Sequence, residues 1–450
     1  MPRDADIEIT HNPSHDYTEL PGDHGGEPLD LTVTLWVVND KVIVFAAPAG
    51  RRTPHTRTHH AVLSASPDEI GELAAWLRGE WQSRIVGRWD PGSCSYPLAD
   101  ATDLRMHATT VDHEIAQLAR SGRHALDTVF AGNDPDLVSF REFLFGELAR
   151  DGLRVSFDSQ LFLPWPLFAV RTDGSPWTSF LGHRHQIEQT GASYPSPQQR
   201  RPARPRPVTS LNHDKALDGV GRAADVHQLL AAESELVVRS SSEELLAALD
   251  RPDFGEDLMY FWCHGAFEGH DPSRPSLVIR LSDSLPISAH TVHLARGEHR
   301  GRDRLEFRPF VLLNACHSGQ AADSPGREYL GRALIEHGAH GVLGPQIAIP
   351  QLFAAEYAHA FLGRYLRGRE TAGEIARSLV HHFHDTLHNP LALTYSLHCG
   401  IDSRLETPPC TSPPLTSTSR EGSGRPAAVI PSQATGSRST SHDTSASRPR

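Results

Sequence analysis

Short apolar runs that alternate with helical segments most strongly limit the folds open to this chain. The runs LMYFW (258–262), FVLLNA (310–315) and GVLG (341–344) carry almost no polar side chain, and helical patterns lie between and after them. A strand without a polar face has to be buried on both sides, which is typical of a mostly parallel sheet with helices on each face. The sequence therefore predicts an α/β fold of this kind over residues 110–405.

A smaller unit is expected before that sheet, over residues 29–109. Two β-rich runs, LTVTLWVV and KVIVFAA, flank Asn39-Asp40, a pair typical of a hairpin turn. Ser66 is followed by a proline and, three positions on, by an acid, which predicts the start of a helix. We therefore expect a β-hairpin-plus-helix extension of unknown role. Its core is expected to hold four tryptophans: Trp36, Trp76, Trp81 and Trp89.

Three stretches lack the periodic apolar residues that a folded element needs. Residues 1–28 and 406–450 are polar, and the second stretch is rich in serine, threonine, proline and arginine. Such segments bury too little apolar surface to offset the entropy lost on ordering, so both are expected to be disordered. The proline- and arginine-rich residues 193–208 predict a solvated insertion that a protease would reach.

Composition narrows the class of protein. The 450 residues include five cysteines, an odd number without a CxxC pair, which argues against a disulfide framework and a structural zinc site. No run approaches the roughly 18 apolar residues of a membrane span, and the N-terminus has no apolar signal region. A formal charge of −12 offers no basic surface to a nucleic acid. We therefore expect a cytoplasmic protein with no membrane and no nucleic-acid partner.

Two of the apolar runs end in residues that can carry chemistry. LMYFW leads into Cys263, His264 and Gly265, and FVLLNA leads into Cys316-His317-Ser318-Gly319. In parallel sheets, catalytic groups gather outside the carboxyl ends of the strands. If the two strands are parallel neighbours, His264 and Cys316 emerge at the same edge of the sheet and face each other.

An imidazole beside a thiol favours nucleophilic chemistry. The imidazole lowers the pKa of the thiol, the thiolate attacks a carbonyl, and the imidazolium protonates the leaving amine. The backbone N–H groups of Gly265 and Cys316 can then form an oxyanion hole. Packing is the competing interpretation, because a free cysteine is often a small core residue. We interpret Cys263 as such a core residue and Cys316 as the nucleophile.

These motifs, in this order, resemble the CHAT family of caspase-like, clan CD cysteine peptidases. The resemblance covers residues 150–405. Five pieces carry it: LFLPWPLFAV (161–170), LMYFWCHG (258–265), FVLLNACHSG (310–319), GRALIEHGAHGVLGP (331–345) and NPLALTYSLHCG (389–400). It implies a caspase-like peptidase domain over 110–405, with His264 as general base and Cys316 as nucleophile. The implied activity is hydrolysis of peptide bonds in a protein substrate, without a metal or an organic cofactor.

The resemblance also implies a biological setting. CHAT proteins often act as effectors in bacterial defence or regulated cell death and are activated by partner domains. For this chain it implies a latent enzyme with a regulatory or activating protein partner. Cleavage within residues 196–208 is the hypothesis for its activation.

Two positions near the cysteine depart from related patterns. Metacaspases, a sister group, carry an aspartate two residues before the cysteine, and this chain has Asn314 there. A neutral amide cannot supply the charge that binds a basic substrate side chain, so Asp323 is considered beside Asn314 as a residue of the substrate pocket. Many CHAT sequences also carry a tryptophan where Pro345-Gln346 stands here, which leaves the wall of that pocket undefined.

Two other functions compete with the peptidase. A degenerate peptidase fold would act as an adaptor, and it differs from the enzyme in whether His264 and Cys316 face one another at a cleft. Another thiol-dependent hydrolase, such as an amidase, differs in whether the cleft admits an extended peptide. His381 and His384 have a spacing that could chelate a metal on a helix face, but a solvated helix face is the preferred interpretation.

Overall fold

The described part of the chain comes from a computed structural model. It comprises residues 28–48, 59–161, 163–191, 204–268, 276–297, 307–320 and 329–405. All of them belong to the first of two units into which the chain divides, Met1–Pro408. The stretches expected to be disordered, 1–28 and 406–450, lie outside the described residues except for Pro28, as does most of the insertion expected at 193–208.

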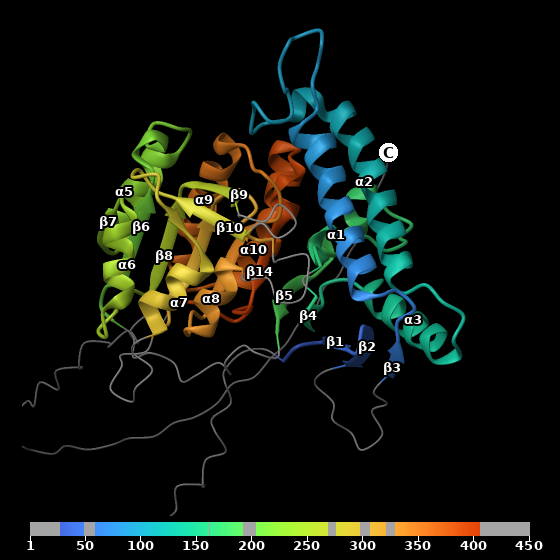
Figure 1. Ribbon diagram of the computed structural model, residues 1–450. Coiled ribbons are helices and arrows are strands. Elements are labelled where there is room, and N and C mark those ends of the chain that lie inside the picture. Colours follow the sequence, from blue (N-terminus) through green and yellow to red (C-terminus); the bar gives the residue numbers. More distant parts are fainter. Residues whose placement is uncertain are drawn as a thin grey trace, which may run out of the picture. The chain divides into compact units, whose positions relative to one another are not determined.

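Strands and helices alternate along most of this length (Figure 1). The first elements are β1 (Leu31–Val38), β2 (Lys41–Pro48), β3 (His59–Val62), α1 (Pro67–Trp81), α2 (Ala108–Val129), α3 (Pro135–Leu148), β4 (Arg154–Ser159), α4 (Leu181–Arg184) and β5 (Gln186–Thr190). Next come β6 (Val208–His213), α5 (Ala223–Glu233), β7 (Glu235–Arg239), α6 (Ser242–Asp250), β8 (Leu258–Trp262), β9 (His264–Glu268), β10 (Ser276–Arg280), β11 (Pro286–Ile287) and α7 (Ala289–Gly297). The last are β12 (Phe310–Asn314), α8 (Leu330–Glu336), β13 (Gly341–Pro345), α9 (Gln351–Tyr365), α10 (Ala372–Leu387) and β14 (Tyr395–His398).

Eleven strands form one sheet in the order β3-β2-β1-β4-β5-β14-β13-β12-β8-β6-β7. Only the pairs β3/β2, β2/β1 and β14/β13 are antiparallel; the other neighbours run parallel. A separate antiparallel sheet has the order β11-β10-β9. The predicted mostly parallel α/β fold is therefore confirmed.

Side chains of the central strands alternate between two hydrophobic cores. On β8, Leu258, Tyr260 and Trp262 belong to one core, whereas Met259 and Phe261 belong to the other. The first core also contains side chains of α5, α9 and α10, and the second contains side chains of α6, α7 and α8. Helices therefore cover both faces of the sheet, as predicted. Burial of each large side chain contributes roughly 1.5–3 kcal/mol, which holds the central strands and the loops after them in place.

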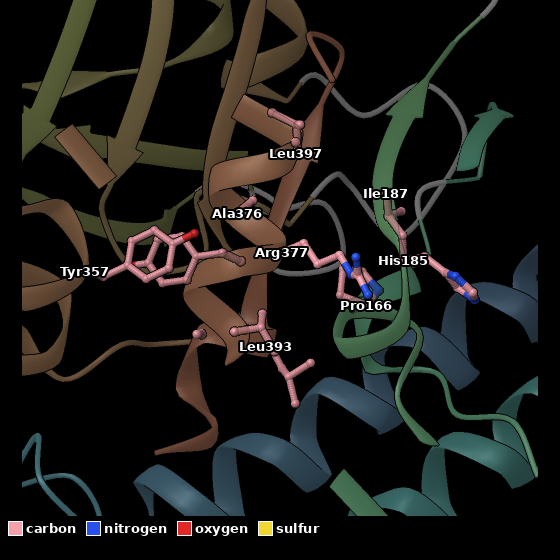
Figure 2. Close-up of a pocket in the computed structure, with 13 residues that line it drawn as sticks. Pro166, His185, Ile187, Tyr357, Ala376, Arg377, Leu393 and Leu397 are labelled. Atoms are coloured by element: carbon pink, nitrogen blue, oxygen red, sulfur yellow. The ribbon is translucent and has the colours of Figure 1, made fainter. Parts of the chain in front are cut away.

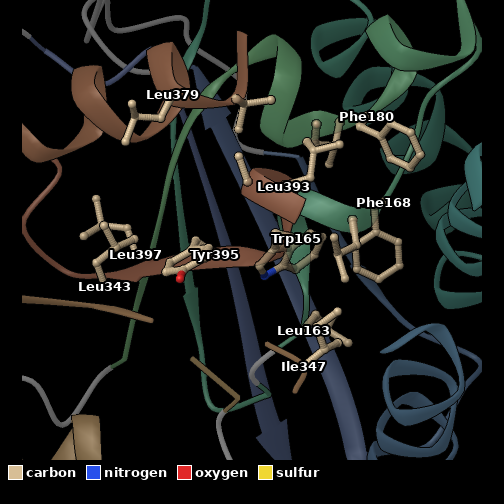
Figure 3. Packing of buried hydrophobic residues seen from close by; sticks show 14 of the residues in the cluster. Leu163, Trp165, Phe168, Phe180, Leu343, Ile347, Leu379, Leu393, Tyr395 and Leu397 are labelled. Atoms are coloured by element: carbon tan, nitrogen blue, oxygen red, sulfur yellow. The ribbon is translucent and has the colours of Figure 1, made fainter. Parts of the chain in front are cut away.

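Tyr395 of β14 lies in the first hydrophobic core together with Trp165, as Figure 3 shows. The Tyr395 ring stacks on Tyr357 of α9 with 3.7 Å between ring centroids. Its hydroxyl donates a hydrogen bond of 2.7 Å to Oδ1 of Asn314, the last residue of β12. Such ring pairs contribute about 0.5–1.5 kcal/mol beyond their buried area. The end of β12 is thus anchored from the side of the sheet on which α9 lies.

The predicted hairpin and helix start of the N-terminal extension are confirmed. Asn39 and Asp40 have φ of 49° and 60°, the left-handed pair that a tight hairpin turn needs. Ser66 and Glu69 form a capping box at the start of α1. β1 pairs in parallel with β4, so the hairpin adds strands to the main sheet.

The prediction that four tryptophans lie in the core of this extension was wrong for three of them. Trp81 is fully buried, whereas Trp36, Trp76 and Trp89 are 46%, 40% and 49% exposed. Trp36 lies on the outward face of β1 and packs edge-on against Phe45. The residue type alone therefore does not predict burial of a tryptophan in this extension, because burial also requires a position that faces the core.

The described end of the expected insertion, residues 204–208, is exposed at Pro205 and Arg206 and still makes defined contacts with the fold. The Arg204 guanidinium donates to the carbonyl of Gly255 at 2.8 Å, and Arg206 donates to two carbonyls at the end of α5. β6 already begins at Val208. The described end of the insertion is therefore anchored to the fold through its two arginines. Among the described residues, no helix combines the length and apolar character needed to cross a membrane.

Candidate active site

Three neighbouring parallel strands end at one edge of the sheet. Trp262, the last residue of β8, lies opposite Asn314 at the end of β12 and opposite His213 at the end of β6. The residues that follow these strands therefore emerge side by side. The structure confirms the parallel, adjacent placement of β8 and β12 on which the predicted site depends.

Cys316 lies in a tight turn directly after β12. The turn is held from inside, because the Ser318 hydroxyl donates to the carbonyl of Leu313 and the Ser318 side chain is fully buried. His317 has a φ of 60°, a left-handed conformation that a helix does not use. Ser318 thus supports a turn, and the next helix of the described residues, α8, starts at Leu330.

The Cys316 thiol is half-buried and lies against a backbone carbonyl. Its Sγ is 3.9 Å from the oxygen of Ile349, which it can reach as a weak donor. Burial raises the pKa of the Cys316 thiol above its ordinary value, while the contact with the Ile349 carbonyl acts in the opposite direction. In this conformation the thiol is therefore protonated at neutral pH, whereas an adjacent imidazole was expected to lower its pKa.

His264 is the first residue of β9 and remains accessible. Its side chain is 51% exposed, and its Nε2 lies 3.6 Å from Oδ2 of Asp214. The Asp214 side chain is only 17% exposed. Its other carboxylate oxygen accepts a hydrogen bond of 3.0 Å from the amide of Ala216, which fixes the carboxylate at this edge.

Gly265 brings the histidine strand against the cysteine turn. A Cβ atom at position 265 would lie 2.2 Å from the carbonyl oxygen of Cys316 and 3.1 Å from its amide nitrogen. No side chain fits in that space, so this position requires glycine for close backbone approach. The residue directly after His264 thus contacts the backbone of Cys316. The participation of the Gly265 and Cys316 N–H groups in an oxyanion hole stays a prediction.

Cys263 and His317 are the chain neighbours of the candidate pair His264 and Cys316. Cys263 is buried in the second core, as predicted, and burial raises the pKa of its thiol. The His317 ring lies 5.1 Å from that of Phe267 on β9, between centroids. Phe267 is 42% exposed, so the two rings form an accessible aromatic edge near the cysteine.

The two residues suggested for the substrate pocket fall in different places. Asn314 is buried, and its amide is engaged on both sides: it donates to the carbonyl of Ala354 at 2.8 Å and accepts from Tyr395. These contacts explain Asn314 as a structural residue at the end of β12, and a role in substrate binding stays a prediction. Asp323 lies outside the described residues.

Asp214 is the residue of the site that sequence reasoning missed. It follows β6, whose sequence VTSLNH carries too many polar residues to be recognised as a buried strand. The rule applied to β8 and β12, that polar residues after adjacent parallel strands meet at one edge, would have found Asp214 once β6 was known.

A pocket elsewhere in the fold does not involve these residues. It lies between α10, β5 and β14, and Figure 2 shows its lining. The lining is mostly apolar, with Leu393, Leu397 and Tyr357 among its residues and the Arg377 side chain at one side. Neither His264, Cys316 nor Asp214 contributes to it. Its composition is that of a gap in the core rather than of a catalytic cleft.

His381 and His384 of α10 lie at a packed interface, not on the solvated face that was expected. The ring of His381 stacks on His183 with 4.2 Å between centroids, and His384 stacks on Trp177 at 4.1 Å. Burial lowers the pKa of His183 to about 4. Among the described residues, no group of three or more histidine, cysteine or acidic side chains is arranged to hold a metal ion.

Sequence comparison gives one family and one curated relative. A family profile described as "CHAT domain" matches residues 138–394. A "Probable protease" of Vitiosangium sp. (strain GDMCC 1.1324) is 28% identical over 173 residues, which are 37% of this chain and 21% of the relative. This chain therefore matches only about a fifth of that relative's length.

Solved structures that align with this chain share less sequence identity with it than the curated relative does. The Saccharomyces cerevisiae separase in its complex with securin has a TM-score of 0.45 and 10% identity, covering 82% of this chain and 30% of that one. The Arg specific cysteine proteinase gingipain R has a TM-score of 0.37 and 8% identity, covering 75% and 76%. Both TM-scores lie below 0.5, so these likenesses do not bear on function.

Proposed function

The chain belongs to the CHAT-domain family, and from that membership we propose that it is a cysteine endopeptidase with Cys316 as nucleophile and His264 as general base. One observation carries the proposal. The glycine after His264 contacts the backbone of Cys316, at the carboxyl ends of two adjacent parallel strands. This contact brings an accessible imidazole and a thiol to the same edge of the sheet.

The reaction follows from the chemistry of these groups. His264 takes the proton from Sγ of Cys316 as the sulfur attacks the carbonyl carbon of the scissile peptide bond. The backbone N–H groups of Gly265 and Cys316 donate to the oxyanion that forms. The imidazolium then gives its proton to the leaving amine, which leaves a thioester on Cys316. Water, deprotonated by His264, attacks the thioester and restores the free thiol.

We assign Asp214 the role of orienting the imidazole of His264. One ring nitrogen of His264, Nε2, faces the Asp214 carboxylate at 3.6 Å. A histidine whose one nitrogen is held by a carboxylate presents the other to its reaction partner. Asp214 therefore orients the ring so that Nδ1 takes the proton, and it stabilises the imidazolium formed during the reaction.

The environment of the thiol supports a latent enzyme. The Cys316 thiol is half-buried, its Sγ faces the carbonyl of Ile349, and burial raises its pKa. Activation must then move Cys316 or His264 so that the two share a proton. Cleavage within residues 196–208 is the proposed trigger. N-terminal sequencing of fragments from wild type and Cys316→Ala tests it, and an intact linker in active protein rules it out.

The proposed substrate is a protein, and the proposed biological role is the one that the CHAT family suggests. The curated relative is itself called a probable protease. We place this chain among the effectors of bacterial defence or regulated cell death, controlled by a protein partner. Recombinant expression in bacteria, with growth followed for wild type and Cys316→Ala, separates a toxic effector from a housekeeping enzyme.

A catalytically inactive adaptor is the second candidate, favoured by one observation. Among the described contacts of Cys316, the Sγ hydrogen bond goes to a backbone carbonyl, and no hydrogen bond joins it to His264. A fold that kept this arrangement permanently would bind partners without cleaving them. The two functions differ in whether any condition produces turnover that depends on the thiol.

A peptide-library cleavage assay tests the proposal. Wild type, Cys316→Ala and His264→Ala are compared, each before and after limited proteolysis of the linker. We expect cleavage by wild type alone. Equal behaviour of the three proteins in every state would contradict the peptidase and leave the adaptor.

A further inference from the structure

The cysteine turn rests against a second segment, residues 345–349, called here the wall segment. The amide of Gly319 donates to the carbonyl of Pro345 at 2.7 Å, and the amide of His317 donates to the carbonyl of Ile347 at 3.1 Å. Sγ of Cys316 lies 3.9 Å from the carbonyl oxygen of Ile349. The place of the thiol and of the backbone around it therefore depends on where the wall segment lies.

The wall segment is held on its other side by the N-terminal extension. Nε of Arg78 on α1 donates to Oε1 of Gln346 at 2.8 Å, and Nε2 of Gln346 donates to the carbonyl of Gly319 at 2.5 Å. Four residues after Arg78, Oε1 of Gln82 accepts from the amide of Ala348 at 2.8 Å. A chain of polar contacts thus runs from α1 through the wall segment into the cysteine turn.

These contacts are more specific than ordinary helix packing. Arg78 is 4% exposed and Gln346 is 1% exposed, and burial of a guanidinium and an amide is costly unless each finds matching partners. Gln346 uses its acceptor toward the arginine and its donor toward the turn, so neither a shorter nor an apolar side chain replaces it. At Gln82 the α-helix changes into a π-helix, Gln82–Val86, a rare form found often at functional sites.

We propose that Arg78 and Gln82 are positioning residues of the peptidase centre, acting through the wall segment on Cys316. The inference rests on the proposed function for its catalytic consequence. The proposal gives the N-terminal extension a role. Through Arg78 and Gln82, the extension fixes the wall segment against which the cysteine turn rests. A displacement of reacting groups by about 1 Å can cost 10²-fold in rate, so loss of one such contact reduces turnover without removing any reacting group.

The sharpest test compares two variants of the same size at position 82. Gln82→Glu keeps an oxygen that accepts from the amide of Ala348, whereas Gln82→Met does not. We expect kcat of Gln82→Met to fall about tenfold with KM within about twofold of wild type, and Gln82→Glu to restore most of kcat. Gln228→Met, the same change at an exposed position of α5, serves as the control and should match wild type.

A second pair of measurements does not depend on peptidase activity. The rate at which iodoacetamide alkylates Cys316, followed by mass spectrometry, reports on the thiol, and hydrogen exchange over 345–349 reports on the wall segment. We expect both rates to change in Gln82→Met and not in Gln82→Glu. If Gln82→Met does not fold, Gln346→Glu, which keeps the acceptor for Arg78 but loses the donor to Gly319, takes its place with the same expectation.

The outcomes separate the two proposals. Wild-type protein that cleaves no peptide in any state contradicts the proposed function, while alkylation and exchange still test the positioning role. Gln82→Met and Gln346→Glu that both equal wild type in alkylation, exchange and kcat overturn the positioning role, whatever the enzyme's activity.

Discussion

The surroundings of His264 and of His183 place the imidazole in opposite environments. At the end of β8, His264 is 51% exposed and faces the carboxylate of Asp214 at 3.6 Å. At the interface of α10 with α4, His183 is 9% exposed, stacks on His381, and has its pKa lowered to about 4 by burial. The first ring is accessible to solvent, whereas burial disfavours the charged form of the second.

The contrast shows that surroundings, not residue type, decide what a histidine does. An accessible ring next to an acid can gain and lose a proton during turnover. A buried ring next to other imidazoles is disfavoured in its charged form and acts as an aromatic packing group. We therefore expect changes around His264 to affect catalysis with little effect on stability, and changes around His183 to do the reverse.

Removal of the nucleophile or the base should have the largest effect. We expect Cys316→Ala to lower kcat/KM for a peptide by about 10⁴-fold or more, and His264→Ala to lower it by about 10²- to 10⁴-fold. The melting temperature of His264→Ala should stay close to that of wild type because the ring is half exposed. A large loss of stability in His264→Ala would break the comparison, since it would make this histidine structural too.

Gly265→Ala tests the close approach of the histidine strand to the cysteine turn. The added Cβ would lie 2.2 Å from the carbonyl oxygen of Cys316, so the two segments must move apart. We expect kcat/KM to fall about 10²-fold, as a displacement of about 1 Å can produce. Gly79→Ala is the control, because nothing lies within 4 Å of that Cβ, and it should be neutral or stabilise α1 by up to about 1 kcal/mol.

Asp214→Asn sharpens the comparison by removing the charge of the carboxylate that faces His264. We expect kcat to fall about tenfold, because an amide orients the ring less strictly and does not stabilise the imidazolium. Asp225→Asn, at an exposed carboxylate of α5, is the matched control. Equal activity of Asp214→Asn and wild type would show that His264 works without an orienting acid.

The smallest effect, and one on stability alone, is expected at the second site. Burial lowers the pKa of His183 from 6.5 to about 4, so the unfolded chain binds more protons between these values. This contribution to the free energy of unfolding is complete above pH 6.5 and is lost as the pH falls through that window. We expect His183→Phe, which keeps a stacking ring, to reduce the loss by up to about 3 kcal/mol in denaturant titrations.

Two controls accompany that measurement. His290→Phe, the same change at an exposed histidine of α7, is the control for the substitution itself. His185 and His398 are also buried, with pKa values lowered to about 4, so the His183 variant keeps part of the slope. An unchanged slope in His183→Phe would show that its ring is not kept neutral.

Short stretches of the chain were enough to predict much of the fold. The hairpin at Asn39-Asp40, the capping box at Ser66 and the apolar strands β8 and β12 were recognisable because each depends on neighbours a few residues away. The edge at which His264 and Cys316 emerge followed from the rule for parallel strands. These features needed no knowledge of distant contacts.

Other features came only from contacts between distant residues. The sequence did not predict strand β6, because Thr209, Ser210 and Asn212 are polar. All three are nevertheless fully buried. Their hydrogen bonds are supplied from other places: Thr209 bonds to Ser234, and the Asn212 amide donates to the carbonyl of Tyr260 at 3.4 Å. A polar strand is stable inside a core only when such partners exist, and hydropathy along the chain does not show them.

For the same physical reason, the sequence predicted some residues of the candidate site and missed others. Local pattern was enough to identify a histidine and a cysteine after two buried strands. Asp214, the contact of Gln82 with Ala348 across 266 positions and the neutral state of His183 were decided by tertiary packing. Hydrogen bonds and burial act through space, and their partners are known only once the chain has folded.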